Sequence, residues 1–108
     1  MPDNKMRKAK VFLKSQFAGI LEETGTGFRF TYDGVFVKTG QPISLSLPLR
    51  SEPYGMPFMF PFFEGMTPEG WYKDIVCATK KIDPADIFGL LLITGSTAGA
   101  VTVSAEGA

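Results

Sequence analysis

The residues of this chain that could do chemistry are mainly carboxylates, because the groups most used in catalysis at neutral pH are scarce. The sequence contains no histidine, so the commonest general base and metal ligand is missing. One cysteine, Cys77, cannot form a zinc site without further ligands of its kind. Two acidic pairs remain, Glu22 with Glu23 and Asp83 with Asp86. We expect the first pair at a strand end and the second at a helix cap, so structure alone accounts for both.

Two glycine-rich stretches, residues 24–28 and 94–99, could be taken for phosphate-binding loops. Neither has the lysine or the spacing of a nucleotide-binding motif. The chain carries 11 basic and 11 acidic residues, so no basic excess attracts nucleic acid. The sequence therefore predicts a protein that is not an enzyme. We expect no catalytic residue, no metal, no cofactor and no direct contact with nucleic acid.

The first half of the chain alternates in the manner of an antiparallel sheet. The clearest example is residues 28–32, where Phe28, Phe30 and Tyr32 share one face and polar side chains take the other. Ser15-Gln16 is expected to form the first turn. The predicted strands are residues 8–14, 17–23 and 28–32, with a short continuation at 35–37 and a further strand at 43–47.

A different composition begins at Pro48 and continues to Pro68. Proline excludes a long helix here and favours extended or single-turn structure. The segment also holds a cluster of apolar side chains that could cover the core or form a partner surface, and the sequence leaves both open. The cluster consists of Met56, Phe58, Met59, Phe60, Phe62, Phe63 and Met66.

Two helices and one strand are predicted after this segment. The first helix runs from residue 69 or 70 to Lys80. The second begins at Asp83, which can cap it, with Pro84 at the first helical position, and it ends at Gly95. Residues 101–103 form a closing strand. These elements predict an α+β fold, in which two main helices pack on a small antiparallel meander that could be barrel-like.

A single domain is expected over residues 8–108, after a flexible N-terminus at residues 1–7. Cys77 lies in an apolar helical stretch and is expected to be a buried thiol. The start of the chain is polar rather than signal-like, and the longest apolar run, residues 90–93, is too short to span a bilayer. We therefore expect a cytoplasmic protein without a membrane contact.

Several segments carry motifs in a fixed order. Residues 44–49 read Ser-Leu-Ser-Leu-Pro-Leu, and residues 61–70 read Pro-Phe-Phe-Glu-Gly-Met-Thr-Pro-Glu-Gly. A helix over 83–91 and the sequence Gly-Ser-Thr-Ala-Gly-Ala-Val at 95–101 follow. Together they resemble the N-terminal subdomain of HipA-type toxin kinases. Thr97 stands where that family usually has an acidic residue, and no kinase segment follows here.

A free-standing subdomain of this kind resembles HipS, the small component of three-component HipBST toxin–antitoxin systems. The resemblance implies an antitoxin that restrains a HipT-like kinase by direct contact, with a HipB-like DNA-binding protein as partner through the complex. It leaves open an assembly subunit that bridges kinase and DNA-binding protein without inhibiting. The aromatic cluster alone would also fit a small β-rich module that binds a ligand or peptide.

Trp71 is the residue expected to contribute most to such a contact. It is the only tryptophan, it opens a predicted helix, and tryptophan is enriched at binding hot spots. We predict that it enters or covers the kinase active site together with Pro68, Glu69, Gly70 and Tyr72. The alternative is that Trp71 packs under the Met/Phe cluster.

Overall fold

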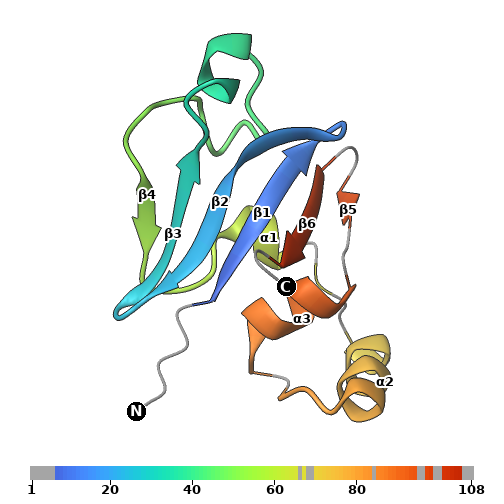
Figure 1. Ribbon diagram of the computed structural model, residues 1–108. Coiled ribbons are helices and arrows are strands. Elements are labelled where there is room, and N and C mark those ends of the chain that lie inside the picture. Colours follow the sequence, from blue (N-terminus) through green and yellow to red (C-terminus); the bar gives the residue numbers. More distant parts are fainter. Residues whose placement is uncertain are drawn as a thin grey trace.

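The computed structural model describes residues 7–65, 67, 70–83, 85–94, 97–98 and 101–105. Six strands form one antiparallel sheet in the order β4-β3-β2-β1-β6-β5 (Figure 1). The strands are β1 Lys8–Leu13, β2 Gln16–Thr24, β3 Gly27–Tyr32, β4 Tyr54–Met56, β5 Thr97–Ala98 and β6 Val101–Ala105. The helices are the 3-10 helix η1 Phe36–Thr39 and the α-helices α1 Pro61–Glu64, α2 Gly70–Lys80 and α3 Ile87–Thr94.

The predicted α+β fold is confirmed, and the meander is visible as the run from β1 to β4. The final strand also pairs back into the sheet, because β6 lies beside β1 with Val103 opposite Val11. The sheet is open: β4 and β5 form its two edges, and no pairing joins them in the described part of the chain. The barrel-like closure that we considered is therefore wrong.

The hairpin between β1 and β2 turns one residue earlier than expected. Leu13 pairs with Gln16, so Lys14 and Ser15 form the turn instead of Ser15 and Gln16. Both turn residues have left-handed backbones, with φ of 51° and 70°. Two consecutive positive φ values are typical of the tight turn that matches the twist of paired strands. Neither residue is a glycine, which explains why sequence signals did not mark this position.

Residues 35–37 do not continue the sheet as predicted. The carboxylate of Asp33 accepts hydrogen bonds from the backbone N–H groups of Val35 (3.0 Å) and Phe36 (3.2 Å). This arrangement bends the chain into η1 directly after β3, because an aspartate that binds amides two and three residues ahead favours a turn.

Residues 43–47 form a loop instead of the predicted strand, and the only pairing recorded for the loop is a bridge between Ser44 and Leu47. The buried Tyr32 hydroxyl holds this loop. It accepts a hydrogen bond from the Ile43 N–H (3.1 Å) and donates one to the Leu47 carbonyl. Burial also raises the pKa of Tyr32, so the phenol stays protonated and able to donate at neutral pH.

The core lies on the face of the sheet that α1 and α3 cover (Figure 1). Phe63 of α1 is fully buried, with ring centroids 5.6 Å from Phe30 and 6.1 Å from Phe60. Most described members of the Met/Phe cluster therefore belong to the core or pack against it, and Met66 lies outside the described residues. Phe58 is the exception, because 58% of its surface is exposed.

The second half matches the predicted helices with one correction. α2 has the expected bounds and ends at Lys80. The next residue, Lys81, has a φ of 57°, which allows the Ile82 N–H to bond the Cys77 carbonyl at 2.9 Å. Cys77 is buried, as predicted. α3 begins at Ile87, four residues after Asp83, and Asp86 caps it instead by accepting from the Gly89 N–H at 3.0 Å.

The predicted helix start fails because Asp83 caps a separate turn. Its carboxylate accepts from the Ala85 N–H at 2.9 Å, and its carbonyl accepts from the Asp86 N–H at 2.8 Å. Pro84, the predicted first helical residue, lies outside the described residues. α3 packs on β6 and α1, whereas α2 lies at the periphery of the molecule, farther from the sheet (Figure 1).

Candidate partner-binding surface

The predicted contact segment lies where the chain enters α2. Gly70, Trp71 and Tyr72 form the first turn of this helix, so their backbones are adjacent at its N-terminal end. Pro68 and Glu69 lie outside the described residues. The segment thus joins the peripheral helix to the loop after α1, and its contact with a partner stays a prediction.

The described part of α2 presents most of its side chains to solvent. Of the seven side chains at positions 74–80, five are exposed and only Cys77 is buried. Ile75 leaves 49% of its surface exposed although it is a large aliphatic residue. The described part of α2 therefore offers an exposed surface that a partner could contact.

The chain is anchored shortly before α2 begins. Thr67 is 8% exposed, and its hydroxyl donates to the Glu64 carbonyl at 2.7 Å. Its backbone N–H bonds the same carbonyl at 3.1 Å. Thr67 therefore closes the C-terminal end of α1 and fixes the point from which the contact segment departs.

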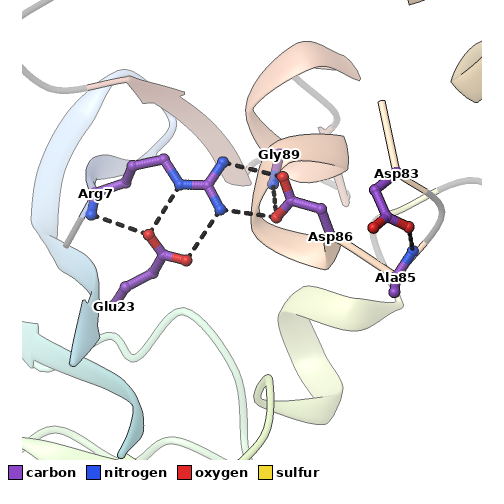
Figure 2. A network of polar contacts seen from close by, with 6 residues as sticks. All are labelled: Arg7, Glu23, Asp83, Ala85, Asp86 and Gly89. Atoms are coloured by element: carbon purple, nitrogen blue, oxygen red, sulfur yellow. Dashed lines mark hydrogen bonds and ion pairs between the residues drawn. The ribbon is translucent and has the colours of Figure 1, made fainter. Parts of the chain in front are cut away.

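A second contact holds the chain in place after α2, and it is made by Arg7. The guanidinium of Arg7 lies between two carboxylates, as Figure 2 shows. On one side it donates to Glu23 of β2, from Nε at 2.8 Å and Nη2 at 2.9 Å. On the other it donates to Asp86, from Nη2 at 2.7 Å and Nη1 at 3.1 Å. We call these three residues the Arg7 clamp, because they join the sheet to the start of α3.

Neighbouring groups reinforce the Arg7 clamp. The Arg7 N–H also donates to Glu23 at 3.0 Å, and the guanidinium carbon lies 5.2 Å from the centre of the Phe88 ring. Hydrogen bonds from Arg7 hold the pKa of Glu23 and of Asp86 below their ordinary values, and those carboxylates raise the pKa of Arg7. All three groups are therefore charged at neutral pH.

The pKa shifts predict a loss of stability in acid. A carboxyl group with a lowered folded-state pKa stabilises the fold above its unfolded pKa, and the contribution disappears as the pH falls through the folded value. The relevant window lies below about pH 4, since unperturbed Asp and Glu titrate near there. We expect the urea midpoint to fall more between about pH 7 and pH 3 in the wild type than in Arg7→Ala.

Arg29→Ala is the matched control for this measurement. Arg29 also binds a β2 carboxylate, donating from Nε to Glu22 at 2.8 Å, but the arginine is exposed and does not bond α3. We expect Arg29→Ala to keep the wild-type pH dependence, because exposed pairs contribute little. Parallel pH curves for wild type and Arg7→Ala would contradict the prediction.

Arg7 is the residue that sequence analysis missed. We placed it in the flexible N-terminus, whereas the structure ties it to the domain. It is separated from Asp86 by 79 positions, and no periodic pattern connects them. The acidic pairs Glu22–Glu23 and Asp83–Asp86 do serve structural contacts, as we expected of them.

Surface hollows in the described part of the chain contain no recognisable catalytic set. One of about 300 Å³ lies beside the Arg7 clamp and is lined by Lys81, Asp83 and Leu92 among others. Another, of about 160 Å³ and mostly apolar, lies between β4 and α1. Among the described residues, no three His, Cys, Asp or Glu side chains are grouped to hold a metal ion. Nor is any described helix long and apolar enough to cross a membrane.

Known proteins with related sequences include one of similar length and one much longer. An uncharacterized protein of Haemophilus influenzae is 38% identical over 102 residues, which span 94% of this chain and 94% of that protein. A putative kinase of Sinorhizobium fredii, Y4mE, is 32% identical over 81 residues. That alignment spans 74% of this chain but only 19% of the kinase.

The fold comparison leads to the same family. A solved structure described as the N-terminal domain of HipA toxin matches with a TM-score of 0.74 at 36% identity, covering 98% of this chain and 97% of that one. The family described as HipA N-terminal domain matches residues 9–104. The motif resemblance is thereby confirmed at the level of the domain, and this chain belongs to the HipA N-terminal domain family.

Proposed function

We propose that this chain is a cytoplasmic, non-enzymatic antitoxin that binds a HipA-like serine/threonine kinase and inhibits it by direct contact. One observation carries the proposal. The aligned domain makes up 19% of the length of the putative kinase Y4mE, but 94% of the length of the Haemophilus influenzae relative. A domain found both within a kinase chain and nearly alone is suited to dock on a kinase body as a separate chain. This arrangement is the one that HipS has in HipBST systems.

The proposed contact is the segment Pro68–Tyr72, with Trp71 at its centre. Its support is the position of residues 70–72 at the start of a peripheral helix whose described side chains are mostly exposed. Inserted at a kinase active site, this segment would prevent productive placement of nucleotide or substrate. A HipB-like protein would join through the complex, consistent with the balanced charge of this chain.

Growth of cells that express a HipT-like kinase tests the proposal. We expect the kinase alone to arrest growth, and co-expression of this chain to restore it in the absence of any DNA-binding partner. Purified kinase should also lose autophosphorylation when this chain is added in excess. Restoration only when the DNA-binding partner is present would instead favour the alternative, a non-inhibitory subunit that bridges the two proteins.

A further inference from the structure

We infer that Arg7 is a positioning residue, which fixes the peripheral helix α2 by clamping the start of α3 to the sheet. The inference deepens the proposed function and rests on it only in the last step, the effect on kinase binding. We call residues 70–94 the α2–α3 arm. Arg7 lies directly before β1 and donates two hydrogen bonds to Asp86 of this arm. Asp86 in turn caps α3.

The first argument is the exposure of the described side chains of α2 and the way the chain continues from it to Asp86. Cys77 is the one buried side chain among positions 74–80, so burial of this part of the helix contributes little to holding it in place. The helix continues through a left-handed residue, Lys81, into the Asp83 turn, and that turn ends at Asp86. Because the Asp86 N–H bonds the Asp83 carbonyl, we expect a displacement of Asp86 to shift the segment that follows α2, and α2 with it.

The second argument is the bidentate geometry on both sides of Arg7. Glu23 belongs to a strand in the middle of the sheet, and Asp86 lies within the arm at the start of α3, so one guanidinium joins the sheet to the arm. The side chains of Arg7, Glu23 and Asp86 are 35%, 22% and 33% exposed, which places all three between surface and core. Planar two-point contacts of this kind fix orientation as well as distance.

The third argument is the glycine at position 89. A Cβ built there would lie 2.3 Å from Asp86 Oδ2 and 3.4 Å from Arg7 Nη1. A glycine inside a helix ordinarily lowers its stability relative to alanine. Here the missing side chain makes room for Asp86 to reach Arg7 and the Gly89 N–H together. Gly89 therefore preserves the Arg7 clamp, although glycine has a poorer helix propensity than alanine.

Amide hydrogen exchange of the free protein tests the clamp without the kinase. In Arg7→Ala we expect exchange over the α2–α3 arm to accelerate about tenfold or more, since hydrogen bonds to charged groups are lost. Exchange over β2 and β3 should change much less. Gly89→Ala should loosen the arm in the same way, although alanine favours helices, and Arg7→Lys should restore part of the protection because it keeps one charge.

Arg29→Ala is again the matched control, because it removes an arginine–carboxylate pair from the same sheet without touching the arm. Unchanged exchange over the arm in Arg7→Ala would overturn the inference. An equal increase over sheet and arm would also overturn it, because Arg7 would then only add global stability.

Kinase affinity separates this inference from the proposed function. We expect Arg7→Ala to bind the HipT-like kinase at least about fivefold more weakly than Arg29→Ala, as coupling through a displaced element typically gives. If the wild-type chain does not bind the kinase, the proposed function fails while the exchange data still decide the clamp. If the arm loosens and affinity is unchanged, Arg7 does not position the contact, and the inference fails.

Discussion

Trp71→Ala is expected to weaken binding of the HipT-like kinase about 30- to 1000-fold, the range that corresponds to a hot-spot loss of roughly 2–4 kcal/mol. Trp71 belongs to the first turn of α2, the helix that lies at the periphery of the molecule (Figure 1). A large aromatic side chain can fill a partner's pocket with little loss of side-chain entropy, so its truncation removes much contact area at once. Calorimetric titration of kinase with the wild type and the variant gives the ratio directly.

The stability of the variant distinguishes the contact from the alternative in which Trp71 packs under the Met/Phe cluster. A core tryptophan cut to alanine costs about 3–5 kcal/mol of unfolding free energy, whereas an exposed one costs little. We expect Trp71→Ala to unfold at nearly the wild-type urea concentration. Leu45→Ala is a control of the same kind, since Leu45 is 95% exposed in the segment between η1 and β4. Normal kinase affinity together with a large loss of stability would refute the contact.

The second large effect concerns the fold. Phe63→Ala is expected to lower the free energy of unfolding by about 3–5 kcal/mol, a large share of the roughly 5–15 kcal/mol typical of a small domain. Phe63 is fully buried on α1, and its ring lies 5.2 to 6.1 Å from those of Phe62, Phe30 and Phe60. Removing it leaves a cavity and deletes three aromatic contacts. Urea unfolding followed by circular dichroism measures the loss.

Phe58→Ala is the matched control for the core substitution. It removes the same side chain from the same proline-rich segment, but 58% of Phe58 is exposed. We expect a loss within about 1 kcal/mol, as for other surface positions. Similar losses in the two variants would mean that the segment does not belong to the core in the way the structure places it.

Local physics made part of this protein predictable from its sequence. The alternation of Phe28, Phe30 and Tyr32 defined β3, since a period of two places these side chains on one buried face. The bounds of α2 followed from proline before it and lysine at its end. The closing strand around Val103 was also visible as a β-branched run. Ordered motifs gave the family, because they depend on residue types rather than on contacts.

The errors arose where a local signal competed with a contact from elsewhere in the chain. Residues 43–47 alternate like a strand, yet they form a loop. The hydroxyl of Tyr32 is hydrogen-bonded to the backbone at both ends of this loop, at Ile43 and at Leu47. The second helix has a good cap at Asp83, but that carboxylate closes its own turn and leaves the cap of α3 to Asp86. Both positions could bind backbone amides, and only the packing of α3 on β6 and α1 selected between them.

The sequence by itself determined strands β1, β2, β3 and β6, the bounds of α2, the lack of histidine and of a zinc ligand set, and the family. The tertiary structure alone decided that the sheet stays open, that Phe63 is buried while Phe58 is exposed, and that Arg7 binds Asp86 across 79 positions. The physical reason is the range of the interactions. Periodicity, capping and turn formation act within a few residues, whereas an ion pair between two elements exists only once both have been placed by the core.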